Sequence, residues 1–336
     1  LMRSSAASDV YKRQIVSNLP MLAPLGGREG LYDYIHNDCR CDGAEVISCP
    51  PYGTDIVKGS AVGYHLMFYP NWIDFYNGNT EYLNKHFGSE KTWREYYCCA
   101  DAAGFERQII EDMDRAEALG AKYAVFHCAD ISNEEVLGNY ALHTNEEVIR
   151  ATAALINRVM RGRKYSFTLL FENLFVPGMT LINSAETELM LSLVEYENKG
   201  IMLDTGHLMA ALRLNGLLTA QKEEGAADAI LNVVAAHWRV KKHILGIHLH
   251  KCSLNMPIEE YTKVITPAES FDERSAQSYA RIMALDAHSP LETDAMRRVI
   301  DAIAPRYIVH ELSARTPAEK AKAVRMQLKS LRGCCP

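Results

Sequence analysis

The sequence Gly200-Ile201-Met202-Leu203-Asp204-Thr205-Gly206-His207 joins a short apolar run to a carboxylate, a glycine and an imidazole. An apolar run of this length is typical of a buried parallel strand. Asp204 would end the strand, and Gly206 would let the chain turn so that His207 returns to the same point. A carboxylate and a neutral imidazole at one strand end make half of a divalent-metal site. The alternative is an aspartate that only caps the next helix, so the ends of the other strands must decide.

Seven further apolar runs occur along the chain, and segments with helical spacing lie between them. Eight apolar strands alternating with helices predict an α/β protein with a single (β/α)8 TIM barrel. A doubly wound sheet would need a glycine-rich phosphate loop, and the sequence has no GxGxxG motif. The seven further strands are expected at residues 15–19, 44–49, 61–68, 122–128, 167–172, 244–250 and 306–311. Helical segments are expected at residues 81–119, 146–160, 226–242 and 293–303, with further helix starts at Gly26, Ser184 and Pro317.

The barrel domain is expected to cover residues 15–333. Residues 1–14 are polar and without periodicity, and they resemble a cloning remnant. We therefore set them aside as a non-native-looking or disordered extension. No linker of disordered composition divides the rest of the chain, so a second domain is not expected.

The composition is that of a globular protein with a sizeable core, since 48% of the 336 residues are hydrophobic and 23% are charged. The net charge of −6 argues against a nucleic-acid or anionic-membrane partner, and no apolar run reaches membrane-spanning length. The nine cysteines form no CxxC pair and no signal peptide is visible, so free thiols in a reducing cytoplasm are expected. These features suit a small-molecule substrate as partner and are compatible with a homo-oligomer.

Acidic and imidazole side chains gather at the expected C-terminal ends of the strands. Glu172 and Glu311 each follow an apolar run, and burying an unpaired carboxylate is costly, so each would need a cation nearby. In a barrel all these ends face one mouth. The strand ends therefore predict a metal centre there, built from His65, His127, Glu172, Asp204, His207, His248, His250 and Glu311.

This series of strand ends resembles that of the xylose-isomerase-like TIM-barrel superfamily, which includes sugar-phosphate isomerases, epimerases and endonuclease IV. The resemblance runs from Ile15 onward. Its epimerase branch implies one divalent ion, Zn, Mn or Co, and an isomerase or epimerase of a small sugar, polyol or sugar phosphate. Glu172 and Glu311 would be the catalytic residues and would move a proton at a metal-polarised carbonyl. The metal ligands implied are Glu172, Asp204, His248 and Glu311.

Substrate contacts are expected from other residues around the same mouth. An aromatic loop at residues 69–76 follows the third strand, and Trp72 would either stack on a sugar or only clasp the barrel rim. His248 is preferred over His250 as the ligand because the superfamily's seventh strand reads His-apolar-x-acid, although Lys251 stands in place of the acid. The expected substrate-binding residues are His65, Trp72, His127, His207, His250 and Lys251.

The endonuclease branch implies a different enzyme, a multi-zinc phosphoester hydrolase with three ions. The negative net charge and the absence of clustered Arg and Lys in the loops at the mouth argue against that branch. A non-catalytic barrel that keeps a metal for structure is a third reading, and it predicts a closed coordination shell. The nine residues that the three-zinc set implies are His65, His127, Glu172, Asp204, His207, His248, Asp286, His288 and Glu311.

Overall fold

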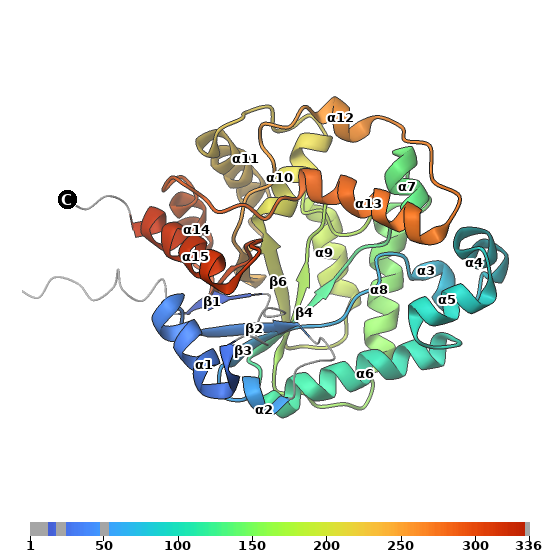
Figure 1. Cartoon of the computed structure of the whole chain (residues 1–336), viewed down its shortest axis with the longest axis horizontal. Helices are drawn as coiled ribbons and strands as arrows, with labels where there is room; N and C mark the ends of the chain where they lie inside the picture. Colours follow the sequence, from blue (N-terminus) through green and yellow to red (C-terminus); the bar gives the residue numbers. More distant parts are fainter. Residues whose placement is uncertain (1–12, 18–24, 48–53, 333–336) are drawn as a thin grey trace, which may run out of the picture.

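Eight strands pair in parallel, each with its neighbours in the sequence, and the last pairs with the first to close a barrel (Figure 1). The (β/α)8 fold class is therefore confirmed. The computed structural model describes residues 13–17, 25–47 and 54–332. The strands are β1 Gln14–Val16, β2 Gly43–Ile47, β3 Ala61–His65, β4 Tyr123–His127, β5 Thr168–Glu172, β6 Lys199–Asp204, β7 Ile244–His248 and β8 Tyr307–His310.

Helices connect the strands and surround the barrel (Figure 1). Within the described ranges, none is long and apolar enough to cross a membrane. From β1 to β4 the helices are α1 Gly27–Asp33, η2 Tyr34–Asp38, α2 Thr54–Val57, α3 Ile73–Tyr76, α4 Thr80–Phe87, α5 Glu90–Tyr97 and α6 Ala102–Leu119. From β4 to β7 they are α7 Asn133–Gly138, α8 Asn145–Met160, α9 Ser184–Leu193, α10 Thr205–Leu214, α11 Glu223–Ala236 and η3 Lys241–His243. After β7 come α12 Ile258–Thr262, α13 Phe271–Leu285, α14 Arg297–Ile303 and α15 Pro317–Arg332.

Three helix predictions were wrong in their extent. The helix expected at 226–242 spans Glu223–Ala236. The segment 81–119 forms three helices rather than one, because Ser89 and Asp101 interrupt it as N-caps. Their side chains accept hydrogen bonds from backbone N–H groups in the first turns of α5 and α6. Thr293 does not cap a helix, since α14 begins only at Arg297. The hydroxyl of Thr293 instead donates to Glu223 at 2.8 Å, which ties this connection to α11.

The side chains that point into the barrel form two layers, an apolar one and, closer to the strand ends, a polar one. Leu170, Met202 and Val309 face inward, and each lies two residues before an acidic side chain on the same face of its chain segment. The polar layer thus begins where the strands end, at the mouth expected for an active site. The apolar layer consists of Ile15, Tyr123, Val125, Leu170, Met202 and Val309.

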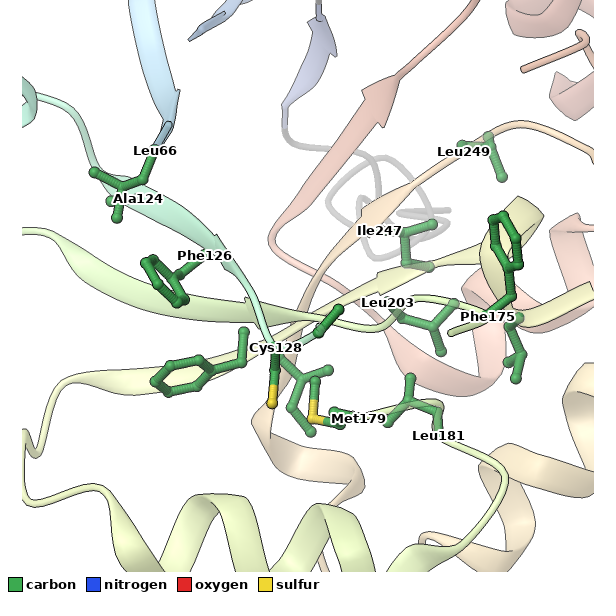
Figure 2. Packing of buried hydrophobic residues seen from close by; sticks show 14 of the residues in the cluster. Leu66, Ala124, Phe126, Cys128, Phe175, Met179, Leu181, Leu203, Ile247 and Leu249 are labelled. Atoms are coloured by element: carbon green, nitrogen blue, oxygen red, sulfur yellow. The ribbon is translucent and has the colours of Figure 1, made fainter. Parts of the chain in front are cut away.

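The outward faces of the strands form the main hydrophobic core against the helices. Phe126, Leu203 and Ile247 lie on these faces and are almost completely buried (Figure 2). In the sequence each of them directly precedes a polar residue of the mouth, so the same strands border both the hydrophobic core and the polar mouth. Close packing of this core restricts the motion of the strand backbone that carries the polar side chains.

Candidate metal centre

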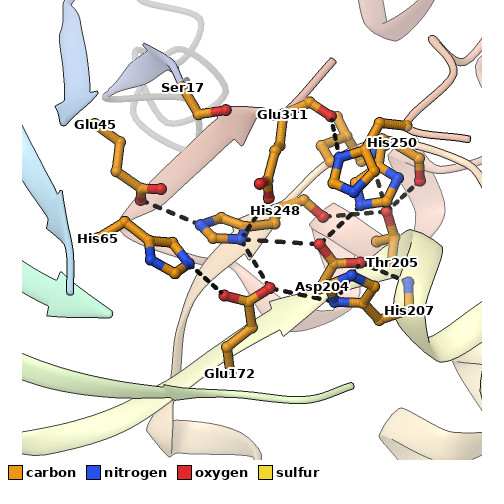
Figure 3. A network of polar contacts seen from close by, with 12 residues as sticks. Ser17, Glu45, His65, Glu172, Asp204, Thr205, His207, His248, His250 and Glu311 are labelled. Carbon is orange, nitrogen blue, oxygen red and sulfur yellow. Dashed lines mark hydrogen bonds and ion pairs between the residues drawn. The ribbon is translucent and has the colours of Figure 1, made fainter. Parts of the chain in front are cut away.

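Four side chains converge at the centre of the barrel mouth (Figure 3). Glu172, Asp204 and His248 end β5, β6 and β7, and Glu311 directly follows β8. One ligand atom from each lies within 4.8 Å of the others. His248 Nδ1 is 3.2 Å from Glu172 Oε1, 3.8 Å from Asp204 Oδ2 and 2.8 Å from Glu311 Oε2. We call this set the central cluster.

The donor atoms of the central cluster fit a divalent cation. Glu172 Oε1, His248 Nδ1 and Glu311 Oε2 are buried and, among the described residues, make no hydrogen bond, although each carboxylate oxygen lies within ion-pair distance of His248 Nδ1. Buried polar atoms are normally satisfied, so three unsatisfied atoms pointing at one place indicate a missing partner. Carboxylate oxygens and imidazole nitrogen suit zinc, manganese or cobalt.

A second set, which we call the β3–β5 cluster, shares Glu172 with the first. His65 Nε2 and His127 Nε2 each lie 3.3 Å from Glu172 Oε2 and 3.1 Å from each other. The other oxygen of Glu172 faces the central cluster. Glu172 can therefore bridge two adjacent cation positions.

A third set, which we call the loop cluster, lies on the other side of Asp204. Its members are His207 in the first turn of α10, His250 after β7, and Asp286 and His288 after α13. Asp286 Oδ2 is 3.1 Å from His207 Nε2 and 3.0 Å from His288 Nε2. The rings of His250 and His288 stack with their centroids 4.0 Å apart.

The long connection after β7 is fixed at the mouth by backbone bonds. Lys251 and Ser289 exchange N–H···O bonds of 2.9 and 3.1 Å, and Ser313 N donates to His288 O. His288 adopts a left-handed φ of 45°, which is uncommon for a residue other than glycine. This geometry returns Asp286 and His288 to the strand ends although β7 ends about forty residues earlier.

Charged neighbours set the protonation of these clusters. Burial favours the neutral form of Glu172, but His248 and His127 outweigh it and hold the pKa of Glu172 well below its usual range. Burial opposes the charge on His207, but the carboxylates of Asp204 and Asp286 raise its pKa well above the ordinary value. For the same reason Asp286 raises the pKa of His288 to about 9. The neighbouring carboxylates thus favour protonation of His207, His248 and His288, and a metal ion bound to these nitrogens would displace their protons.

A further ring of residues orients these side chains. The side-chain amide of Asn173 donates through Nδ2 to Asp204 O and accepts through Oδ1 from Asp204 N at 2.8 Å. The backbone carbonyl of Asn173 contacts His207 Nδ1 at 3.0 Å. Thr205 donates to the carbonyls of His248 and His250. Such contacts fix the orientation of imidazole ligands and commonly tune metal affinity.

Glu45 on β2 is a member of the site that the sequence reasoning missed. Its Oε2 lies 3.1 Å from His248 Nε2 and accepts a hydrogen bond of 2.8 Å from the Tyr123 hydroxyl. Glu45 is completely buried. The sequence did contain a sign of this role, because Glu45 lies in the apolar segment Gly43–Ile47. Burying an unpaired carboxylate is costly, so Glu45, like Glu172, needs a partner.

Two of the expected substrate contacts, Trp72 and Lys251, do not line the cavity at the metal centre. Trp72 is buried in an aromatic cluster, where it stacks on Phe105 and its Nε1–H donates to Ala129 O at 3.0 Å. Lys251 pairs with Glu223 at 2.7 Å and with Glu292 at 3.3 Å. A backbone carbonyl satisfies the indole N–H of Trp72 and two carboxylates satisfy the ammonium of Lys251, and the sequence does not reveal these partners.

A cavity of about 360 Å³ opens onto the three clusters. His65, His127, His207, Asp286, His288 and Glu311 line it, whereas His248 and His250 lie deeper. Segments after β3, after β5 and on α13 supply its apolar part, which we call the apolar wall. The apolar wall consists of Phe68, Pro70, Leu174, Phe175, Ile282 and Met283.

Known structures share the fold. No protein-family model and no curated protein sequence matches the chain. D-allulose 3-epimerase from Methylomonas sp., solved with D-allulose, is 11% identical, with a TM-score of 0.54 over 95% of this chain and 96% of the other. A putative xylose isomerase from Rhodospirillum rubrum is also 11% identical, with a TM-score of 0.54 over 96% and 99%. Endonuclease IV from Thermus thermophilus is 14% identical, with a TM-score of 0.48 over 95% and 99%. The chain thus has the fold of xylose-isomerase-like TIM barrels.

Proposed function

We propose that this chain is a divalent-metal-dependent isomerase or epimerase that acts on a small sugar or polyol derivative. One observation carries the proposal. Glu172 and Glu311 approach His248 Nδ1 to 3.2 and 2.8 Å from two different strands, so two carboxylates border one point beside the cavity. Two such groups suit the removal of a proton from a carbon and its return.

The central cluster, Glu172, Asp204, His248 and Glu311, would hold the ion. When bound, a divalent ion supplies Lewis-acid polarisation of a carbonyl and of the hydroxyl beside it. Burial disfavours charge on Glu311, but His248 and His288 hold its pKa below the usual range, so the carboxylate is ionised at neutral pH and can accept a proton. Glu172 is ionised for a related reason and can act on the other side of the reacting carbon. His207 lines the cavity next to Glu172 and would contact a hydroxyl of the substrate.

The cavity suits a small substrate better than a polymer. Its volume of about 360 Å³ lies in the range of small-molecule sites. No described residue that lines it is a lysine or arginine. A duplex nucleic acid would need a surface of such side chains to hold its phosphates.

A second candidate function, hydrolysis of a phosphoester with three metal ions, rests on a separate observation. The β3–β5 cluster and the loop cluster provide two further ligand sets on either side of the central cluster. Together the three clusters contain all nine residues that the resemblance to endonuclease IV implies, and His250 in addition. Closely spaced metal ions can stabilise both oxygens of a phosphoester displacement.

The metal content per chain separates the two candidates. Purified protein should be reconstituted with Zn²⁺ or Mn²⁺, desalted and analysed for metals by mass spectrometry. One tightly bound ion, lost in Asp204→Asn, supports the isomerase. Three ions, of which one is lost in Asp286→Asn, support the hydrolase.

Solvent exchange tests the isomerase reaction directly. Metal-loaded protein should be incubated in D₂O with D-allulose and with simpler α-hydroxy ketones, and the carbon next to the carbonyl should be examined by NMR. Deuterium incorporation is expected for the wild type and should fall at least about a hundredfold in Glu311→Gln. Glu292→Gln, in an exposed residue outside the cavity, is the matched control. Isomerisation without label would contradict proton transfer, and phosphoester cleavage without isomerisation would contradict the proposed class.

A further inference from the structure

We propose that the substrate is amphipathic, with a metal-chelating hydroxy carbonyl at one end and an apolar group at the other. The cavity has two kinds of lining, since all of its described histidine and carboxylate residues belong to the metal clusters and the apolar wall comes from three separate elements. The other polar groups of the described lining are the hydroxyls of Tyr69, Tyr279 and Ser313. This inference rests on the proposed function only in placing the reacting end of the substrate at Glu172 and Glu311.

The apolar wall offers few groups to a polyol. The N–H of Ile131 already donates to Pro70 O, and the N–H of Leu174 donates to Met179 O. The Tyr69 hydroxyl, which also belongs to a residue lining the cavity, donates to Tyr97 O at 3.0 Å. A sugar hydroxyl placed against this wall would lose its water without gaining a partner, which is costly.

Two aromatic rings of the wall lie beside the metal clusters. Phe68 packs on His127 with ring centroids 4.0 Å apart, and Phe175 lies 5.8 Å from His207. Phe68 keeps 44% of its surface exposed although it is a large apolar residue at the cavity. An exposed aromatic ring at the edge of a polar site provides a stacking surface for an apolar ligand group.

A phosphate group at the distal end of the substrate would need a lysine or arginine side chain close to it. None of the described residues that line the cavity is Lys or Arg. An uncharged distal group is therefore favoured over a terminal phosphate.

Two hydroxamates with six carbons test this inference on the zinc-loaded protein. Hexanohydroxamate and gluconohydroxamate carry the same chelating head, but the second has a hydroxyl on every carbon of its tail. Their dissociation constants, measured by isothermal titration calorimetry, should be corrected for their affinities for free Zn²⁺. Each buried methylene favours binding by about fourfold, so hexanohydroxamate should bind at least about tenfold tighter.

A matched pair of variants locates the preference. Met283→Gln changes the apolar wall and should reduce the ratio of the two affinities at least about threefold. Met326→Gln makes the same change on α15, outside the cavity, and should leave the ratio unchanged. Circular dichroism of both variants checks that they are folded.

The outcomes separate this inference from the proposed reaction. Equal affinities, tighter binding of gluconohydroxamate, or no binding of either probe would overturn the amphipathic substrate, whatever the solvent-exchange result. A clear preference for hexanohydroxamate would uphold it even if no hydroxy ketone exchanges its proton.

Discussion

Replacing Gly206 by alanine should destabilise the protein and remove one side of the metal centre. Gly206 is buried in the first turn of α10, and its backbone conformation would suit alanine. A β-carbon there would lie 2.0 Å from His250 Cε1 and 2.2 Å from Nδ1. The sequence suggested that this glycine permits a turn, but the structure shows that it makes room for the imidazole.

The size of the effect follows from what His250 would lose. To reach ordinary contact its ring must retreat by about 1.4 Å, and His288 stacks on it at 4.0 Å. Overpacking of this kind costs about 1–3 kcal/mol, and loss of the 2.8 Å bond to Asp204 costs about 1.5–3 kcal/mol more. Alanine recovers about 1 kcal/mol of helix propensity, so we expect a net loss of about 3 kcal/mol. With an unfolding entropy of about 2.1 cal/mol/K per residue, this lowers Tm by about 4–5 °C.

Thermal unfolding of the metal-free variant, followed by circular dichroism, measures this loss, and a zinc titration measures the number of sites. Gly138→Ala on α7 is the matched control, because there the β-carbon meets only the ring of Tyr140, which is 48% exposed and can turn away. The control should change Tm by less than about 2 °C. A Gly206→Ala protein with wild-type Tm and wild-type zinc stoichiometry would refute the reasoning.

Two further predictions concern groups around the centre. Glu45→Gln should weaken zinc binding by about 10–100-fold in competition with a chromophoric chelator, because His248 loses the carboxylate that orients it, whereas Glu292→Gln should have no effect. Burial lowers the pKa of His310 to about 3, and its imidazole bonds Gln14 and Gln327. Below pH 6.5 the unfolded chain therefore binds a proton that the folded chain does not, so stability falls as pH falls, by about 2 kcal/mol at pH 5. Urea unfolding at pH 7 and pH 5 should show a change in stability that is less favourable in the wild type than in His310→Gln by about 2 kcal/mol, and equal changes in the two proteins would contradict it.

The fold class could be predicted from the sequence because its signals are local. Apolar runs such as 200–203 and the helices between them alternate along the chain, and parallel strands need such crossovers. The inward position of Glu172 and Asp204 also follows from a local rule, since side chains alternate along a strand above an apolar layer. The helix ends at Ser89 and Asp101 were missed because cap residues also occur within helices, where solvent and packing decide their role.

Tertiary structure alone decided how the polar residues are shared among clusters. Closure of the barrel lets Glu45 on β2 reach His248 on β7, although 203 residues separate them in sequence. The connection after β7 could have left Asp286 and His288 anywhere at the surface. The backbone bonds between Lys251 and Ser289 and the contact of His288 Nδ1 with Glu311 O fix them at the mouth.

Residue type also could not show which side chains face the cavity. Trp72 and Lys251 have the chemistry of substrate contacts, but Trp72 donates to Ala129 O, Lys251 pairs with Glu223, and neither side chain lines the cavity. The sequence by itself determined the strands and the polar strand ends, because these depend on spacing within a segment. The barrel's closure and its loops decided the grouping of ligands and the apolar wall, because contacts between distant segments depend on the path of the whole chain.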